Sequence, residues 1–334
     1  MDFPDWAREK WVQYEGNPIV GYFEPEKPRA AIGDPQVLVP GQFDDCWHMF
    51  YHGFYDTDCT PYFHHLVSED GFKWSLVSKK QFNVNPTYIF KNGDEWILYY
   101  SAVLSREQGA FEKYGCVNMI RAKRSSDLEN WGEDTDILVP SLPWEKEYDP
   151  EQLNRIEARN PCVVKLYGGG YRLYYSAGTV KLGDCGYEEP KYISFADAPS
   201  PLGPFEKHGE PVIVPDSKIP YRNLGAGAIK VYGCRGEYLA LYNSIYTDAD
   251  GHSRSAINLL KSRDGICFEE YPGNPIVVPS GTGWNGELIY QLDLVRFGGE
   301  LRLYYNAREG FRDGIERIGC AVIADAETQV EKLW

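Results

Sequence analysis

The sequence of 334 residues lacks the features that identify several common classes of protein. It contains no run of Lys or Arg, and its formal net charge is −15, so neither a nucleic acid nor an anionic membrane is an expected partner. It has no stretch of 18 apolar residues, and residues 1–16 show no apolar segment behind a basic end. Neither a membrane span nor a secretory signal is therefore predicted, and the expected location is the cytoplasm.

The cysteines and histidines lack the spacing of a disulfide framework or a metal centre. The eight Cys form no C-x-x-C pair and fall mostly in apolar segments, which is typical of reduced, packed thiols. His52, His64 and His65 lie near two Asp in the sequence, but adjacent residues of a strand point to opposite faces. We therefore expect no metal and no cofactor.

The sequence is instead rich in aromatic residues, which make up 15% of it and include 25 Tyr and 9 Trp. Such rings favour half-buried strands. One two-strand unit recurs five times: an apolar run, a turn, and an aliphatic-aromatic run that ends in Tyr. Its copies span residues 34–51, 85–100, 160–175, 225–242 and 290–305.

A second signature follows most copies: a Ser or Ala, then an Asp, and an aromatic residue a few positions later. It occurs at residues 68–74, 125–131, 196–205 and 262–268. Asp and Gly there favour a tight turn between a third and a fourth strand. Four strands in each of five units predict an all-β, five-bladed β-propeller that fills one domain, residues 1–334. The alternative is a β-sandwich with coincidental internal similarity.

The two ends of the chain predict how the ring closes. Residues 10–20 resemble residues 266–277, which are expected to form the outer strand of the fourth blade and the link to the fifth. The fifth copy ends near Asp325 and leaves little chain for an outer strand of its own. An N-terminal strand is therefore expected to complete the last blade and to remove the open sheet edges.

The first strands and the loops after the second strands should meet on one face of the ring, where binding sites of propellers can form. Asp34 opens the first copy, and a carboxylate at an apolar-walled mouth suits a general base or a nucleophile, although a turn role before Pro35 is the alternative. Asn85 and Asn160 occupy equivalent positions, where an amide binds hydroxyl groups or simply stabilises a turn. Tyr290 opens the fifth copy.

Cleavage of a glycosidic bond requires a second carboxyl group. Glu157 lies between two arginines, which argues against a resting general acid, whereas Glu287 lies near Trp284, Leu288 and Tyr290, and apolar neighbours raise the pKa of a carboxyl group. We expect the acid to be Glu287 or Glu157. Surface ion pairs are the alternative role for both, and other loop carboxylates stay open: Asp56, Asp58, Asp184, Asp248, Asp250 and Glu309.

Several other residues are candidates for holding a polyhydroxylated or charged ligand. Arg159, Arg222 and Arg308 have the guanidinium geometry that binds pairs of oxygen atoms, with exposed salt bridges as the alternative. His52 begins the first long loop, and Trp284, like Trp6, has a weak strand context that leaves a sugar-stacking role open.

The Asp34-Pro35 opening, the Leu-Tyr-Tyr-Ser runs and the five repeats resemble the five-bladed propeller glycoside hydrolases and phosphorylases of family 43 and its relatives in families 32, 68, 117 and 130. The resemblance covers nearly the whole chain, but its motifs are short. It implies a small carbohydrate substrate and makes the acidic residue at the start of the first blade the base or nucleophile, a position that Asp34 matches.

The sequence departs from these families at two positions. Families 32 and 68 carry Arg-Asp-Pro at the start of the third blade, where this chain has Arg159-Asn160-Pro161, and the fourth blade opens with Arg222-Asn223 and without the expected acidic glutamate. Four hypotheses follow: an inverting hydrolase with Asp34 as base, a phosphorylase with arginines on phosphate, a propeller that binds sugar without cleaving it, and a structural scaffold.

Overall fold

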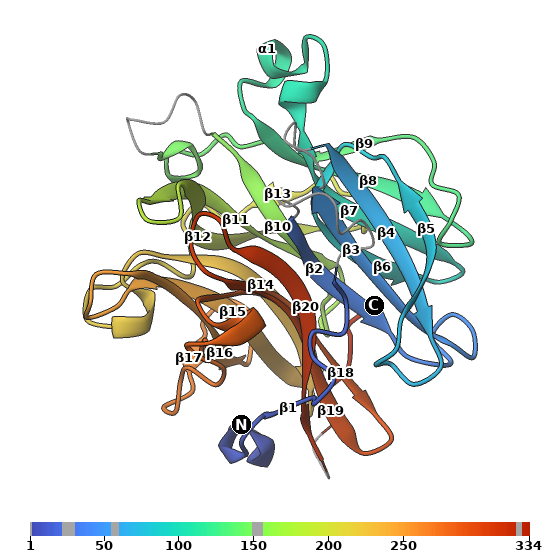
Figure 1. The fold of residues 1–334 in the computed structure, drawn as a ribbon. Coiled ribbons are helices and arrows are strands. Elements are labelled where there is room, and N and C mark those ends of the chain that lie inside the picture. Colours follow the sequence, from blue (N-terminus) through green and yellow to red (C-terminus); the bar gives the residue numbers. More distant parts are fainter. Residues whose placement is uncertain (1, 22–30, 55–59, 149–155, 325–328) are drawn as a thin grey trace.

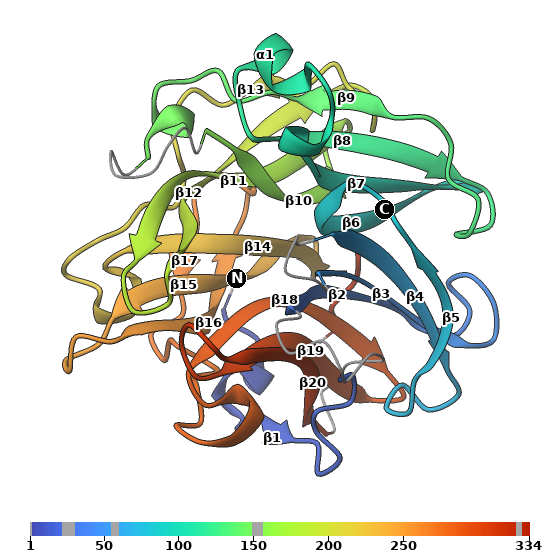
Figure 2. The same cartoon turned by 45° about the horizontal axis from the view of Figure 1, so that its top comes forward.

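The computed structural model describes residues 2–21, 31–54, 60–148, 156–324 and 329–334. It consists of five four-stranded antiparallel sheets around a central axis (Figure 1; Figure 2), so the predicted five-bladed β-propeller is confirmed. No helix in these ranges combines the length and the apolar character needed to cross a membrane. The seven cysteines that fall in them form no disulfide bond.

The strands of a blade follow one another from the axis outward, and each of the five repeats forms the two inner strands. The first blade contains β2 (Ala31–Leu38), β3 (Trp47–Phe54), β4 (Pro61–Ser68) and β5 (Ser75–Lys80). The second contains β6 (Val84–Asn92), β7 (Glu95–Val103), β8 (Asn118–Ser125) and β9 (Thr135–Leu138). The third contains β10 (Ala158–Lys165), β11 (Tyr171–Leu182), β12 (Tyr187–Ala198) and β13 (Glu206–Lys207).

The fourth blade contains β14 (Gly225–Cys234), β15 (Glu237–Thr247), β16 (Ser253–Ser262) and β17 (Glu269–Glu270). The fifth contains β18 (Leu288–Phe297), β19 (Glu300–Glu309), β20 (Ile315–Ile323) and β1 (Val12–Gln13). The 3-10 helix η1 (Asp5–Arg8) precedes the first strand. Other short helices connect strands: α1 (Ala110–Tyr114) and the 3-10 helices η2 (Leu104–Arg106), η3 (Trp144–Lys146), η4 (Pro220–Arg222) and η5 (Gly283–Asn285).

The ring closes as predicted, because β1 pairs with β20 as the outer strand of the fifth blade. The amide of Asn17 extends this pairing: its Nδ2 donates to the carbonyl oxygen of Cys320 at 2.8 Å, and its Oδ1 accepts the Cys320 N–H at 2.9 Å. In the fourth blade, Asn274 makes the same two bonds to Leu259, at 2.9 and 2.8 Å. The similarity of the two segments thus reflects one shared way of ending a blade.

The predicted turns between third and fourth strands also hold neighbouring blades together. In the first blade, Asp70 Oδ1 accepts the N–H groups of the residues two and three positions later, both at 2.8 Å. The hydroxyl of Tyr304 in the fifth blade donates to the Gly71 carbonyl oxygen at 2.9 Å. Tyr174 of the third blade binds Gly265 of the fourth in the same way, at 2.6 Å. The repeated Tyr therefore explains how successive sheets are joined.

The last residues of the chain contact every blade at the end of the axis where the first strands finish. Glu331 pairs with the fourth blade, Lys332 binds the fifth and the first, and Leu333 accepts a backbone hydrogen bond from the third. The ring of Trp334 packs against Trp96 of the second blade, with 5.7 Å between the ring centroids. Residues 329–334 therefore cover one end of the axis and tie the five sheets together.

Removing the charge of Lys332 is expected to destabilise the fold. Its Nζ lies 2.5 Å from Oδ2 of Asp293, and both side chains are buried. Lys332→Met leaves a buried carboxylate without its ion-pair partner, which typically costs about 3–5 kcal/mol of unfolding free energy. Urea denaturation of the single variant and of the double variant with Asp293→Asn tests this, because the double variant should recover part of the loss. Equal stability of wild type and Lys332→Met would contradict the expectation.

Candidate active site

Each first strand contains a β-bulge near its start, and the bulges face the axis at one height. The strand pairing shifts between Gly33 and Gln36 in the first blade and between Arg159 and Cys162 in the third, and the other three blades have the same irregularity. Asp34 and Asn160 sit in these bulges with φ of 58°. Asp and Asn tolerate this left-handed conformation better than most residues, which explains why these two residue types occupy the bulges.

The bulges line a cavity of about 110 Å³ at the axis. All five blades contribute to it, through the bulges of the first strands, the ends of the second strands and the starts of the third strands. Its lining residues are Asp34, His52, Pro86, Arg159, Asn160, Glu189, Pro190, Gly227, Asn243, Tyr290, Gln291, Asn306 and Glu316.

Asp34 is buried, with 5% of its surface exposed, and two residues contact it. Its backbone N–H donates to Oδ1 of Asn306 at 3.3 Å. Its Oδ2 lies 2.6 Å from Nδ1 of His52, whose side chain is also buried. The backbone of Asp34 is thus held in a rigid strand, and the imidazole of His52 lies against its carboxylate. A buried carboxylate on a rigid strand suits a group that accepts a proton at a defined point.

Glu189, near the start of β12, is the most perturbed carboxyl group of the cavity. Burial raises its pKa, and the charges of Glu316, Glu157 and Asp34 raise it further. The Arg159 guanidinium opposes these effects, and the resulting pKa is about 8. A carboxyl group with this pKa carries a proton near neutral pH and can donate it.

Glu316, near the start of β20, adds a third carboxyl group to the cavity. Burial raises its pKa, and the nearby charge of Asp34 acts in the same direction, whereas Arg308 and His52 lower it. Its Oε1 lies 3.3 Å from the Arg308 guanidinium. Like charges that share a small site disfavour full ionisation, so Glu316 contributes to keeping Glu189 protonated.

A chain of amides forms a polar wall of the cavity. Asn160 donates through Nδ2 to Ser176 Oγ at 2.6 Å and to the Gly227 carbonyl oxygen at 2.8 Å, and its Oδ1 accepts from Gln291 Nε2 at 2.7 Å. Asn243 Oδ1 accepts the N–H of the residue after Gly227, at 2.6 Å. Gly227 is required here, because a Cβ atom at this position would lie 2.4 Å from Nδ2 of Asn243.

The two glutamates predicted as acids lie elsewhere. Glu157 is buried beside the cavity, where Arg159 lies 2.9 Å from its Oε1 and Asn118 Nδ2 donates to its Oε2 at 2.6 Å. Glu287 lies outside the residues that line the cavity and contacts the guanidinium of Arg254. Arg254 lies on β16 of the neighbouring blade, and nothing in the sequence around Glu287 indicates this contact.

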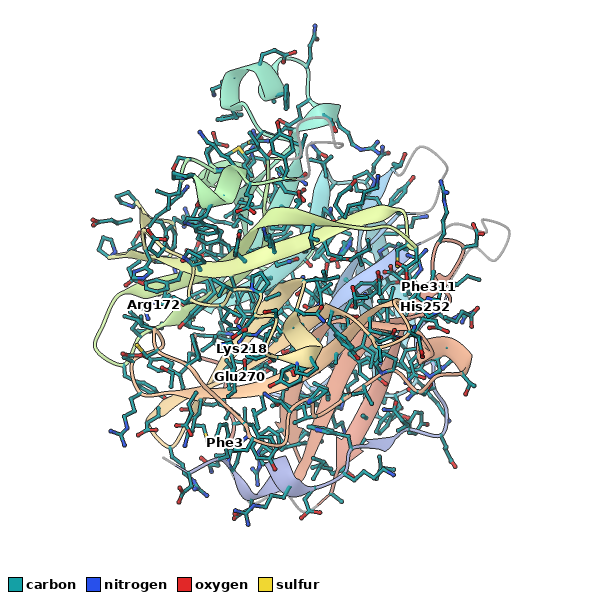
Figure 3. The ribbon with its side chains drawn as sticks, turned by 90° about the vertical axis from the view of Figure 1, so that its left-hand side faces the viewer. Phe3, Arg172, Lys218, His252, Glu270 and Phe311 are labelled. Atoms are coloured by element: carbon teal, nitrogen blue, oxygen red, sulfur yellow. The ribbon has the colours of Figure 1, made fainter. Side chains whose placement is uncertain are left out.

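The environment of Glu287 is therefore polar rather than apolar. Arg254 also lies 2.9 Å from Asp248, and its guanidinium carbon is 5.2 Å from the centroid of the Phe311 ring. Phe311 in turn stacks on His252, with 5.2 Å between centroids (Figure 3). These contacts form a charged and aromatic rim cluster of the fourth and fifth blades.

The predicted binding residues separate into two groups. Arg159, Asn160, Tyr290 and His52 line the cavity. Asn85, Arg308 and Trp284 do not line it. The residue after Asn85, Pro86, does line the cavity, and Arg308 contacts the lining residue Glu316. Trp284 packs on Tyr305, with 5.3 Å between the ring centroids. Of the alternative loop carboxylates, Asp56 and Asp58 lie outside the described residues.

Sequence reasoning missed Glu189 and Glu316. Both follow the second strand of their blade, in the region where the sequence analysis expects the loops of the binding face. In the structure both residues lie inside strands that begin on that face. Treating the start of each third strand like the start of each first strand would have selected them.

The raised pKa of Glu189 predicts a dependence of stability on pH. Because its pKa rises from the usual 4.5 to about 8 on folding, the folded state binds this proton more tightly than the unfolded state does. Stability is thus lost as pH rises from about 4.5 to about 8. Thermal melts of wild type and Glu189→Gln at pH 5 and pH 9 test this: the variant should lose less stability between the two values. The same loss in both proteins would contradict the assignment.

Comparisons with known proteins agree with this architecture. No family model and no curated protein matches the sequence. Solved structures do: a glycosyl hydrolase from Bacteroides ovatus has a TM-score of 0.66 and 14% identity, over 100% of this chain and 99% of the other. A second similar structure was reported with the statement that the GH130 family of mannoside phosphorylases contains glycoside hydrolases that target β-1,2 mannosidic linkages in Candida mannan. Its TM-score is 0.64 and its sequence identity is 14%, over 99% of this chain and 98% of the other.

A thermostable family-43 glycoside hydrolase is also similar, with a TM-score of 0.52 and 20% identity, over 79% of this chain and 97% of the other. At these identities the likeness establishes the fold. It agrees with the predicted resemblance to the five-bladed propellers of families 43 and 130. The chemistry of this chain has to be argued from its own cavity.

Proposed function

We propose that this protein is a glycoside hydrolase that cleaves a small oligosaccharide or glycoside in the axial cavity. One observation carries the proposal: a fixed carboxylate, Asp34, and a carboxyl group with a pKa of about 8, Glu189, line the same cavity. Glycosidic cleavage needs this combination of a base or nucleophile and a proton donor. The similar structures named as glycoside hydrolases support the same class of reaction.

We assign the base to Asp34 and the acid to Glu189, in place of Glu287 and Glu157. Glu287 is paired with Arg254 away from the cavity, and Glu157 is held by Arg159 and Asn118. A carboxylate that is paired with a guanidinium is a poor proton donor at neutral pH.

In the proposed reaction Asp34 takes a proton from a water molecule, whose oxygen attacks the anomeric carbon. The bond from that carbon to the leaving oxygen breaks, and Glu189 gives its proton to this oxygen. The configuration inverts, and Glu189 regains a proton from solvent while Asp34 returns one. The amides of Asn160, Asn243 and Gln291 provide hydrogen-bonding groups for sugar hydroxyls.

Hydrolysis is favoured over phosphorolysis because the arginines near the cavity already form ion pairs. Arg159 is already paired with Glu157 and Arg308 with Glu316. Phosphate would have to enter the cavity beside the carboxylate of Asp34 and displace these ion pairs. Water meets no such electrostatic barrier.

A panel of aryl glycosides, assayed with and without inorganic phosphate, tests the proposed function. Turnover in phosphate-free buffer is the expected result. Turnover that requires phosphate identifies a phosphorylase instead. Sugar binding without product identifies a carbohydrate-binding propeller, and neither binding nor turnover on a broad panel would contradict any role in carbohydrate chemistry.

We also propose that residues 1–334 act as one domain in the cytoplasm. The five blades share one axis, and both ends of the chain take part in the ring. The seven described cysteines form no disulfide bond, as is usual in a reducing compartment.

A further inference from the structure

One amide oxygen in the wall of the axial cavity has no hydrogen-bond partner. Gln291 lies in the bulge of β18 in the fifth blade, lines the cavity and is 5% exposed. Its Oε1 accepts no hydrogen bond from any group in the part of the chain that the structure describes. A buried acceptor without a donor is costly, so a ligand that brings a donor to this oxygen gains affinity.

The hydrogen bonds around Gln291 decide which end of its amide is left over. The carbonyl oxygen of Gly227, in the bulge of β14, can only accept, so the Asn160 atom that lies 2.8 Å from it is the donor Nδ2. The atom of Asn160 that faces Gln291 is therefore Oδ1, and it accepts from Nε2 of Gln291 at 2.7 Å. The Gln291 amide thus binds within the protein through its nitrogen and leaves its oxygen for a ligand.

The protein also holds this amide in a fixed position. Asn160, to which Gln291 donates, is anchored in the third blade, because its Nδ2 also donates to Ser176 Oγ at 2.6 Å. Gly227 ties the same asparagine to the fourth blade. The side chain of Gln291 is therefore oriented by contacts that cross three blades. An acceptor that is already in place needs no rearrangement on binding, which favours selective recognition.

We propose that Gln291 is a specificity-determining residue whose Oε1 accepts a hydrogen bond from one hydroxyl group of the sugar in the axial cavity. The inference rests on the proposed function, since that function places a sugar in the cavity. A site built to bind a substrate hydroxyl rejects an analogue that lacks it, because the buried partner is then left unpaired. Glycosides without a donor at the carbon that faces Gln291 are therefore poor ligands.

The test is the binding of methyl pyranosides to wild type and to Gln291→Met, measured by isothermal titration calorimetry. The methyl glycoside that binds most tightly in a panel of hexosides and pentosides is compared with each of its monodeoxy analogues. Wild type should bind one of these analogues about 10- to 100-fold more weakly than the parent glycoside. Gln291→Met keeps the length of the side chain but removes the amide, so it should bind that analogue and the parent with equal affinity.

Two controls show that the effect comes from a donor on the sugar and from position 291. Fluorine cannot donate a hydrogen bond, so the monofluoro analogue at the same carbon should bind wild type as weakly as the deoxy analogue does. Gln108→Leu changes an exposed glutamine between η2 and α1 in the second blade. This variant should discriminate between the parent and the deoxy analogue as wild type does.

The outcomes separate this inference from the proposed function. Loss of discrimination in Gln291→Met supports the inference, even if no glycoside is cleaved and the proposed function fails. If Gln291→Met binds the parent and the analogue more weakly by the same factor, as general damage to the cavity would cause, the inference is overturned, even in an active enzyme. A wild type that binds none of the panel, or binds all monodeoxy analogues as well as the parent, also overturns it. Gln291→Leu replaces Gln291→Met if the latter does not fold.

Discussion

Replacing Asp34 with asparagine is expected to lower kcat by about 10²- to 10⁴-fold, the usual effect of removing a general base, while the affinity for the sugar changes little. Asparagine has the same shape, and its amide cannot take the proton from water. The fold should tolerate the change, because Asn160 already occupies the equivalent bulge of the third blade with φ of 58°. Steady-state kinetics and a binding isotherm on one glycoside measure both effects.

The matched control for this variant is Asp94→Asn. Asp94 is exposed in the turn between β6 and β7, at the end of the blade remote from the cavity. Its replacement should leave kcat and KM unchanged. Undiminished turnover by Asp34→Asn would remove Asp34 from the mechanism.

Replacing Glu189 with glutamine is expected to lower kcat/KM by about 10²- to 10⁴-fold for glycosides with poor leaving groups, because these need protonation as the bond breaks. Nitrophenyl glycosides, whose leaving group is a weak base, should be affected much less. If the ratio of wild-type to variant kcat/KM depends on the leaving group, the variant has lost an acid; general damage to the site would lower kcat/KM equally for all leaving groups. Glu210→Gln, which changes an exposed glutamate of the same blade, is the control.

The pH profile of the wild type should report the same residue. Because the pKa of Glu189 is about 8, kcat/KM is expected to fall as pH rises through this value and the acid loses its proton. In Glu189→Gln this alkaline limb should disappear for nitrophenyl substrates. An unchanged alkaline limb, or equal losses on all leaving groups, would assign the acid to another residue.

The architecture could be predicted from the sequence because each blade repeats local signals. Strand periodicity, the Asp-containing turns and the Asn17 and Asn274 segments all act over short distances, and each corresponds to a contact in the structure. The position of Asp34 in the cavity could be predicted for the same reason. Its position in the first repeat places it at the axis, whatever the other blades contribute.

Glu189, the proposed acid, could not be predicted in this way, because its pKa depends on contacts between blades. Glu287 has apolar neighbours in sequence, but Arg254 reaches it from the preceding blade. Glu189 has the charged and polar neighbours Glu188 and Lys191 in sequence, and only the ring brings it to Asp34 and Glu316. The same limit applies to Lys332, since nothing local places a C-terminal lysine beside Asp293.

The most direct test of the central claim is a crystal structure of Asp34→Asn soaked with a glycoside that the wild type cleaves. The account predicts an intact glycoside in the axial cavity, with its anomeric carbon between position 34 and the carboxyl group of Glu189. A sugar bound on any other surface, with the axial cavity filled only by water, would contradict it.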